Sequence, residues 1–431
     1  MDYDEMLALI DSLGRFGMKL TLDRINALLD QIDHPERRLR AVHVAGTNGK
    51  GSTVAFLDAI LRAAGYAVGR YTSPHLVDFR ERVAIAGRPV PPGALLRAFD
   101  RVWPAVLRIK DGPAGHPTQF EVGTAMAFLI LAEAGLDAVL IEVGLGGRHD
   151  TTNVIDPLLT ILTHLALDHT DRLGPDLASI AAEKAGTIKP GRPVVAAPQA
   201  EEALAVILAE AERQGAPVRL VGRDLVYDLV RADSDGTYCA MRGQRDYGTL
   251  RLNLLGAHQA MNAATAVAAT EVLAERGFVV PCEAVRQGLA EAIWPGRLEI
   301  VRHEPLIVLD GAHNPDGMAA LARALTEVFR RERVDFLLGI LDNRPVEEMV
   351  GLIAPSARRV VVTTVPGGTA PSASTERVAA ALARFGTPVE AEADPRAALA
   401  RAVDALPRGG LLCVCGSLYL VGTIRGMLIK E

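Results

Sequence analysis

The residues best suited to chemistry form a glycine-rich segment, VAGTNGKGST, at positions 44–53. It follows an apolar, β-rich run and precedes a helical stretch, which is where a phosphate-binding loop lies in α/β proteins. The glycines let backbone N–H groups turn toward phosphate oxygens, Lys50 supplies positive charge, and Ser52 or Thr53 can donate to phosphate or a metal ion. The Walker A spacing is not met, so a plain glycine-rich turn is the alternative. The placement between strand and helix favours a phosphate loop.

Two further candidates stand at the ends of strand-like runs. Glu142 closes DAVLIEVG before a glycine-rich turn, and His169 follows the next such run within LALDHTD. Ligands of open α/β folds collect at the carboxyl edge of the sheet, so both are predicted at that edge. Taken alone, Glu142 is explained equally well as a magnesium ligand or general base and as a solvated strand end. A lone histidine such as His169 is more often structural.

The order of elements around these residues predicts a parallel α/β fold. Short β-rich runs alternate with longer Ala/Leu-rich helical stretches, and one open sheet can hold all the strands. The predicted strands are 40–46, 66–73, 137–144, 157–163 and 192–198, and the predicted helices are 52–65, 120–135 and 177–186. Polar-alternating runs then predict antiparallel strands at 224–230, 237–243 and 249–256, before helical sequence resumes at Ala257.

The best domain boundary lies at Trp294, Pro295 and Gly296, where two helix breakers follow a helix-like segment. Beyond it a Rossmann-like alternation begins. Its predicted strands are 305–310, 334–340, 358–365 and 410–416, and its predicted helices begin near Asp316, Val346 and Ser374. Residues 365–375 are predicted to form a surface loop. We therefore predict two domains, residues 1–296 and 297–431.

Composition limits the partners. The 431-residue chain is 49% apolar and carries a formal net charge of -6, so it has no global positive field for nucleic acid or an anionic membrane. We find no uncharged apolar stretch of about 18 residues, and the acidic start MDYDEMLALI lacks the basic region of a signal peptide. We expect a cytoplasmic protein with no nucleic-acid or membrane partner.

The cysteines also favour a cytoplasmic protein. Cys239, Cys282, Cys413 and Cys415 are too few and too scattered for a disulfide framework, which fits a reducing compartment. Strand alternation places Cys413 and Cys415 on one face, where metal ligation is conceivable, but a buried strand is the favoured interpretation.

Ordered motifs along almost the whole chain carry a family resemblance. The segment GTNGKGS resembles the phosphate loop of the Mur ligase superfamily, in particular of the dihydrofolate synthases and folylpolyglutamate synthases. Further matching segments are LGRFGMKLTLDRI (13–25), TSPHLVDFRERV (72–83), EVGLGGRHDTTN (142–153), LDHTDRLGPDLASIAAEKAG (167–186), GAHQAMNAATA (256–266), PGRLEI (295–300), LDGAHNPDG (309–317) and GSLYLVG (416–422). The resemblance implies a P-loop Mur-ligase-type central domain followed by a smaller Rossmann-like C-terminal domain, with ATP bound between them.

The implied reaction joins L-glutamate to dihydropteroate or folate. ATP converts the acceptor carboxylate into an acyl phosphate, and the glutamate amine displaces phosphate to leave an amide. Such a site must neutralise crowded phosphate charge, which suits lysines and magnesium. The implied nucleotide-binding residues are Gly46, Thr47, Asn48, Gly49, Lys50, Gly51, Ser52, Asn262, Arg297 and Asp310, with His313 close to the nucleotide. The implied ligands of two magnesium ions are Ser73, Glu142, His169 and Lys184, the last as a carbamate. Lys50, Lys184 and His313 are the implied catalytic residues, and the family suggests a monomer.

The resemblance also implies an acceptor site. Phe120 is placed to stack on a pterin, although a core residue at a helix start is nearly as good an interpretation. The polar edge would be formed by Thr118, Gln119, Glu121, His149, Asp150 and Thr151. The chain departs from the family at two places, with His149-Asp150-Thr151 for Leu-Asp-Ala and Asp342-Asn343-Arg344 for Asp-Lys-Asp. These changes bear on pterin or glutamate preference.

Two alternatives stay open. One is a cell-wall Mur ligase with a nucleotide-linked peptide acceptor, which would add an N-terminal nucleotide-sugar domain before the phosphate loop. The other is a catalytically silent ATP-binding regulator, against which the presence of Lys50, Glu142, His169 and Lys184 argues.

Overall fold

A computed structural model describes residues 1–14, 21–368 and 370–429. Its contacts divide the chain into two compact units. Unit 1 comprises residues 1–228, 240–250 and 261–292, and unit 2 comprises residues 229–239, 251–260 and 293–431. The predicted domains 1–296 and 297–431 stay a prediction, because packing units are not the same thing as functional domains.

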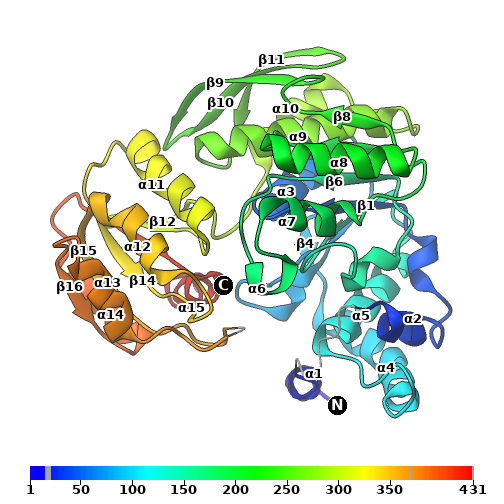
Figure 1. Cartoon of the computed structure of the whole chain (residues 1–431), viewed down its shortest axis with the longest axis horizontal. Helices are drawn as coiled ribbons and strands as arrows, with labels where there is room; N and C mark the ends of the chain where they lie inside the picture. The colour runs from blue at the N-terminus through cyan, green and yellow to red at the C-terminus, as the bar shows by residue number, and fades with distance from the viewer. Residues whose placement is uncertain (15–20, 369, 430–431) are drawn as a thin grey trace. The chain divides into compact units, whose positions relative to one another are not determined.

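Unit 1 is built on an eight-stranded sheet with the order β4-β3-β2-β5-β1-β6-β7-β8. Figure 1 labels β1, β4, β6 and β8 of this sheet. Its strands are β1 (Ala41–Ala45), β2 (Val68–Tyr71), β3 (Val83–Ile85), β4 (Arg88–Pro89), β5 (Ala138–Glu142), β6 (Leu159–Leu162), β7 (Val194–Ala196) and β8 (Val218–Leu220). Six neighbouring strands pair in parallel, in the order β2, β5, β1, β6, β7 and β8. Beside β2, the strands β3 and β4 form an antiparallel edge. Every residue of β1 and β5 is buried, as expected for strands covered on both faces.

Helices cover this sheet and close its core. They are α1 (Tyr3–Ser12), α2 (Asp23–Leu29), α3 (Lys50–Ala63), α4 (Pro92–Ile109), α5 (Gln119–Glu133), α6 (Thr170–Leu173), α7 (Leu177–Ala185), α8 (Glu201–Arg213) and α10 (Cys282–Glu291), with short 3-10 turns at Pro35–Arg38, Phe79–Arg82 and Thr151–Val154. The helix α10 packs closely on α3, because a Cβ at Gly288 would lie 2.4 Å from the Cα of Ile60. That contact fixes the helix that follows the phosphate loop.

A three-stranded sheet, β11-β10-β9, and the helix α9 (Ala257–Ala274) each have residues in both units. The strands are β9 (Val226–Asp233), β10 (Gly236–Arg242) and β11 (Asp246–Leu252). The prediction of three short strands followed by a helix from Ala257 is therefore confirmed.

Unit 2 contains a six-stranded sheet with the order β12-β13-β17-β14-β15-β16. Its strands are β12 (Glu299–His303), β13 (Leu306–Leu309), β14 (Val334–Leu338), β15 (Ala357–Val362), β16 (Val389–Ala391) and β17 (Leu411–Cys415). Its helices are α11 (Pro315–Phe329), α12 (Val346–Ile353), α13 (Thr375–Ala383), α14 (Pro395–Asp404) and α15 (Leu418–Leu428), with a 3-10 turn at Ala354–Ser356. Only β12 pairs antiparallel, with β13.

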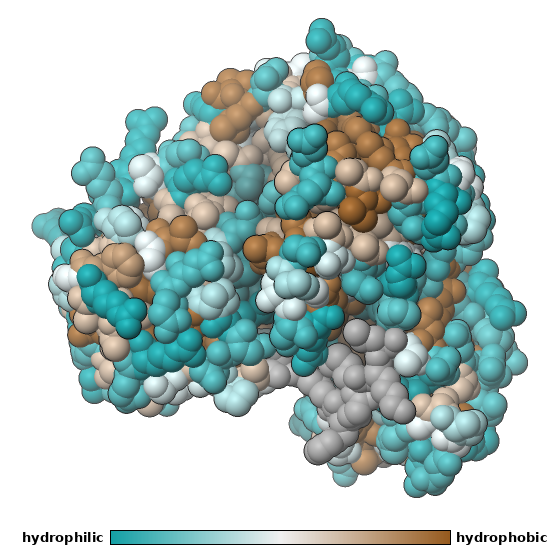
Figure 2. Space-filling model, in the orientation of Figure 1, coloured by the Kyte–Doolittle hydropathy of each residue, from teal (hydrophilic) through white to brown (hydrophobic). Residues whose placement is uncertain are grey.

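The strands and helices predicted from the alternating pattern are confirmed, as is the α/β fold class. Cys413 and Cys415 are buried in β17, which confirms the strand interpretation. The predicted motif at 13–25 lies partly outside the described residues, as does residue 369 of the predicted loop 365–375. No helix in the described part of the chain is long and apolar enough to cross a membrane, and Figure 2 shows polar residues interspersed with apolar ones over the visible face.

Candidate active site

The phosphate loop connects β1 to α3 and depends on its glycines. Gly49 has φ +88°, a left-handed conformation that glycine adopts at little cost. A Cβ at Gly49 would lie 2.2 Å from Oδ1 of Asn262, and one at Gly46 would lie 1.8 Å from Oγ1 of Thr163. The loop is therefore packed against two polar side chains, one of which, Asn262, is a predicted nucleotide-binding residue. The structure brings Asn262 to the loop although more than 200 residues separate them in sequence.

Backbone bonds hold the first half of the loop. The N–H groups of Thr47 and Asn48 donate to the carbonyl of His164 at 3.0 and 3.2 Å, and the hydroxyl of Thr163 donates to the carbonyl of Asn48. These N–H groups are therefore engaged within the protein. The N–H groups suited to an anion are those of the first turn of α3, which have no acceptor within the helix.

Two lysines converge on one carbonyl of the loop. The Lys50 Nζ donates to the carbonyls of Gly46 and Thr47 at 3.1 and 3.2 Å, and the Lys184 Nζ donates to the carbonyl of Gly46 at 2.9 Å. Burial and the neighbouring charge of Lys50 lower the pKa of Lys184 to about 7, although nearby carboxylates, Asp168 foremost, oppose the shift. The site therefore concentrates positive charge and holds one amine that loses its proton readily.

The predicted metal ligands come from four different segments of unit 1. The N–H of Ser73 donates to Oε2 of Glu142 at 3.2 Å, so these two residues lie together at the end of β5. His169 adopts a left-handed conformation, φ +52°, directly before α6, and its N–H donates to Asp168. Among the described residues no group of three His, Cys, Asp or Glu side chains forms a ready metal site. The predicted set contains only two such side chains, so it depends on the Ser73 hydroxyl and on a modified Lys184.

The donor chemistry of these residues nevertheless fits magnesium. A carboxylate and a hydroxyl supply the oxygen ligands that this ion prefers. A carbamate on Lys184 would add another oxygen ligand, and its formation requires the neutral amine that the lowered pKa favours.

The turn that follows β5 is organised by Asp150. This buried carboxylate accepts from the N–H of Leu145 at 2.8 Å and from both the N–H and the hydroxyl of Thr152. Burial raises the pKa of Asp150, and these hydrogen bonds oppose the rise. The turn also lies on α7, because a Cβ at Gly147 would come within 2.8 Å of the Cα of Lys184. The predicted acceptor turn therefore adjoins the predicted carbamate lysine.

Its neighbours in the sequence differ in exposure. His149 is exposed, and Thr151 is partly buried at the start of a 3-10 turn.

The other acceptor segment is the start of α5. Thr118 and Glu121 form a reciprocal cap, in which each side chain accepts from the other residue's backbone N–H. Glu121 also accepts from Arg24 at 3.1 Å, and Gln119 donates to Asp11 at 2.6 Å. These three polar side chains thus have structural partners.

Phe120 joins the two acceptor segments. Its ring stacks on Tyr71 with centroids 6.3 Å apart, and a Cβ at Gly144 would lie 2.4 Å from its Cζ. Phe120 is only partly buried, so both earlier interpretations keep support: the ring packs against the core and leaves part of its surface free.

Three predicted nucleotide residues belong to unit 2. Asp310 directly follows β13, and its carboxylate accepts from the N–H groups of Leu298 and Ala312 at 3.0 and 2.9 Å. The Nδ1 of His313 donates to the carbonyl of Gly311 at 2.8 Å. A Cβ at Gly311 would lie 2.3 Å from Nη1 of Arg297. The structure therefore brings Arg297, Asp310 and His313 together around one turn.

Sequence reasoning missed Thr163 and His164, which contact the phosphate loop, and Asp168, whose charge acts on Lys184. Thr163 ends the predicted strand 157–163, and its position at the carboxyl edge was the one available signal. Nothing in the sequence predicts that the carbonyl of His164 holds the loop.

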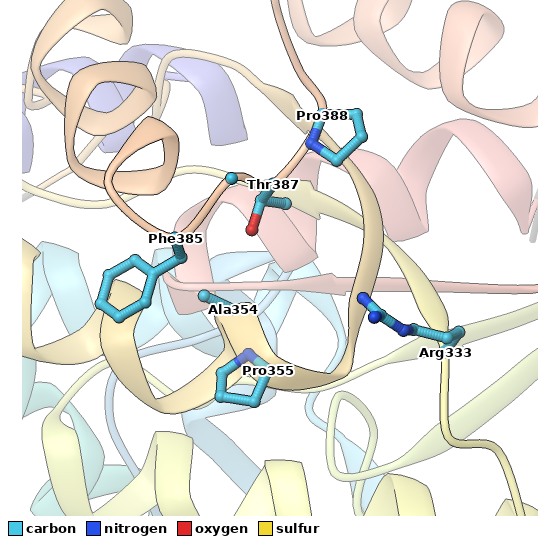
Figure 3. Close-up of a pocket in the computed structure, with 7 residues that line it drawn as sticks. Arg333, Ala354, Pro355, Phe385, Thr387 and Pro388 are labelled. Atoms are coloured by element: carbon cyan, nitrogen blue, oxygen red, sulfur yellow. The ribbon is translucent and has the colours of Figure 1, made fainter.

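A separate pocket of about 230 Å³ lies in unit 2 (Figure 3). Its walls are formed by Arg333, Ala354, Pro355, Phe385, Gly386, Thr387 and Pro388. It contains none of the predicted site residues.

Comparison with known proteins identifies two family regions in this chain. Residues 44–270 match the Mur ligase middle domain, and residues 296–418 match the Mur ligase glutamate ligase domain. The first region includes the phosphate loop, Glu142, Lys184 and Asn262, and the second includes Arg297, Asp310 and His313.

Individual relatives match over most or all of the chain. The dihydrofolate synthase/folylpolyglutamate synthase of Bacillus subtilis is 40% identical over 81% of this chain and 82% of its own length. The folylpolyglutamate synthase of Lacticaseibacillus casei is 35% identical over 100% of this chain and 99% of its own. The structure of Mycobacterium tuberculosis folylpolyglutamate synthase complexed with ADP superimposes with a TM-score of 0.92, at 33% identity, over 100% of this chain and 98% of that one.

Proposed function

Because this chain belongs to the Mur ligase family, among its folylpolyglutamate and dihydrofolate synthases, we propose that it joins L-glutamate to dihydropteroate, to folates or to both. The reaction consumes ATP and releases ADP and phosphate. The convergence of Lys50 and Lys184 on the carbonyl of Gly46, at the start of α3, carries the proposal. That arrangement supports the proposal, because positive charge and helix N–H groups would stabilise a transferring phosphoryl group bound at this loop.

The chemistry divides into two steps. An oxygen of the acceptor carboxylate attacks the γ-phosphorus of ATP, and the bond to the β-phosphate oxygen breaks to give an acyl phosphate and ADP. The glutamate amine then attacks the acyl carbon, phosphate leaves, and the amine proton passes to solvent. Lys50 stabilises the negative charge that spreads over the transferring group in the first step.

Magnesium is part of the proposal, with Ser73, Glu142, His169 and carbamylated Lys184 as its ligands. A bound magnesium ion would neutralise phosphate charge and orient the nucleotide. Lys184 has the required buried amine with a lowered pKa. Arg297, Asp310 and His313 of unit 2 remain proposed nucleotide residues, with His313 and the two lysines as catalytic groups.

The carbamate is tested by mass spectrometry under native conditions. Bicarbonate should add the mass of one carbon dioxide to the wild-type protein and raise its activity. Lys184→Ala should abolish both responses. Lys189→Ala is the matched control, because Lys189 also has a pKa lowered by burial, yet donates to the carbonyl of Asn153 outside the phosphate loop. A bicarbonate response that survives in Lys184→Ala contradicts the modification at this residue.

The acceptor would lie against Phe120 and the turn at His149, Asp150 and Thr151, with Thr118, Gln119 and Glu121 beside it. Contact between Phe120 and Gly144 brings these two segments together. We also infer a cytoplasmic monomer, for which the free cysteines are consistent with a reducing compartment.

The deciding experiment measures ADP release with ATP alone, then with glutamate, with dihydropteroate, and with both. A ligase sustains ADP release over many turnovers only when both substrates are present, because without glutamate the reaction stops at the acyl phosphate. Mass spectrometry of the product separates dihydrofolate from folates with longer glutamate tails. A silent ATP-binding regulator would show no glutamate-dependent release, which would overturn the proposal.

A further inference from the structure

A buried histidine lies behind the acceptor turn. His43 is the middle residue of β1, is fully buried, and belongs to none of the proposed substrate or nucleotide residues. Its Nε2 lies 2.8 Å from the hydroxyl oxygen of Thr152, while its Nδ1 is buried and has no hydrogen-bond partner among the residues that the structure describes. A buried imidazole with one satisfied nitrogen has a defined orientation.

The hydrogen bonds at Thr152 fix their own direction. The Thr152 hydroxyl has one proton and donates it to Oδ1 of Asp150, whose two oxygens also accept the backbone N–H groups of Leu145 and Thr152. His43 must therefore donate from Nε2, and its Nδ1 carries the free lone pair. Burial, with the nearby charge of Lys189, lowers the pKa of His43 to about 3 and keeps the ring neutral. The result is a chain of donors that runs from His43 to Thr152 to Asp150.

Asp150 connects this hydrogen-bond chain to the backbone of the acceptor turn. Its other oxygen holds the N–H of Leu145, while Oδ1 also holds the N–H of Thr152. One carboxylate therefore spans the turn from its start to its end. His149 and Thr151 flank Asp150 directly, so its rotation would displace both.

We propose that His43 is a positioning residue for the carboxylate acceptor, acting through Thr152 and Asp150 without touching substrate. The assignment of the affected subsite rests on the proposed function. The hydrogen-bond chain itself does not.

Matched pairs of variants test the proposal by a KM comparison on the full-length protein. His43→Leu and Thr152→Val remove the donor or relay, and His43→Gln and Thr152→Ser retain a group that can bond at the same point. Loss of a hydrogen bond within a chain that ends on a charge corresponds to roughly a tenfold change or more. We expect the first pair to raise KM for dihydropteroate or folate by about that factor and the second pair by less than about threefold.

The KM for ATP separates positioning from packing. His43 lies in β1, three residues before Gly46 of the phosphate loop, so a general disturbance of β1 would raise KM for ATP as well. We expect KM for ATP to stay unchanged in all four variants. Equal impairment of His43→Gln and His43→Leu, equal rises in both KM values, or wild-type kinetics in His43→Leu would each overturn the proposal.

A measurement on the wild-type protein covers the case in which a variant fails to fold. Nitrogen-15 NMR of labelled histidine should show His43 with a protonated Nε2 and an unprotonated Nδ1 at neutral pH, and His43→Gln assigns the signal. The opposite tautomer would overturn the donor chain. Absence of glutamate-dependent ADP release from wild type would instead overturn the proposed function, so the two failures are distinguishable.

Discussion

The phosphate loop and the acceptor turn follow neighbouring strands of one sheet, β1 and β5, yet their polar side chains are used differently. At the phosphate loop, Lys50 and Lys184 bond to backbone carbonyls, and the Lys50 ammonium adds positive charge at the start of α3. At the acceptor turn, Asp150 is occupied by N–H and hydroxyl donors from the turn itself. The difference teaches that the phosphate loop would bind its ligand through charge. The acceptor turn would instead bind through its shape, which the hydrogen bonds to Asp150 maintain.

Lys50→Ala gives the largest expected effect and tests the charge side of this comparison. Because the ammonium stabilises the transferring phosphoryl group, kcat should fall by at least about 100-fold. ADP release with saturating substrates measures it, and thermal unfolding should show an intact fold.

Lys110→Ala, at the partly buried C-cap of α4, provides a lysine control far from the phosphate loop in sequence. Unchanged turnover in Lys50→Ala would contradict both the comparison and the assigned role of this lysine.

Gly49→Ala tests whether the phosphate loop also depends on shape. The variant suffers a left-handed backbone at φ +88° and a Cβ 2.2 Å from Asn262. Gly65→Ala is the matched control, because Gly65 has φ +89° with nothing within 4 Å of the added Cβ. Both share the backbone cost, so the difference between them reports the clash, about 2 kcal/mol in the free energy of unfolding. Denaturant titration measures it, and equal losses would show that Asn262 moves aside freely.

The acceptor turn should carry a pH signature through His43. Its pKa is about 6.5 in the unfolded chain and about 3 when folded, so the unfolded state binds one more proton between these values. Stability is therefore full above pH 6.5 and falls on acidification, by up to about 1.4 kcal/mol per pH unit from this group. His43→Gln should remove that slope. His75, with a pKa lowered to about 4, titrates in both proteins and cancels in their difference. Parallel stability curves would contradict a neutral, buried His43.

The sequence predicted much of this arrangement because strands and phosphate loops are local patterns. Residues 40–53 alternate from strand to glycine-rich turn to helix, and the structure has β1, the loop and α3 there. The N-terminal helices α1 and α2 were not predicted, nor was the edge strand β12. Their placement depends on partners distant in sequence, as when Met6 and Ile10 complete the core beneath α5.

The contacts in the candidate site likewise differ in whether they follow from local sequence or from distant segments. The position of Glu142 at a strand end could be predicted, because it follows from the length of an apolar run. The approach of Asn262 to Gly49, and of Lys184 to Gly46, could not be, because each joins segments more than 130 residues apart. The mutual hydrogen bonds of Thr118 and Glu121 could be predicted in part from the sequence, since Thr-x-x-Glu before an apolar helix is a capping signature.

Thr118→Ala gives the smallest expected effect and probes the shape side of the comparison most directly. Thr118 caps α5, so its loss should reduce the free energy of unfolding by about 1 kcal/mol, as measured by denaturant titration. Thr118→Ser keeps the capping oxygen and should retain wild-type stability. If the acceptor region acts through shape, KM for the folate acceptor should rise only about twofold to threefold in Thr118→Ala, in step with the looser helix start. A rise of about 100-fold without loss of stability would mean that the hydroxyl binds substrate directly, because a cap contributes to folding and a ligand contact does not. The acceptor segment would then act through free polar groups, as the phosphate loop does, and the contrast between the two regions would be wrong at this position.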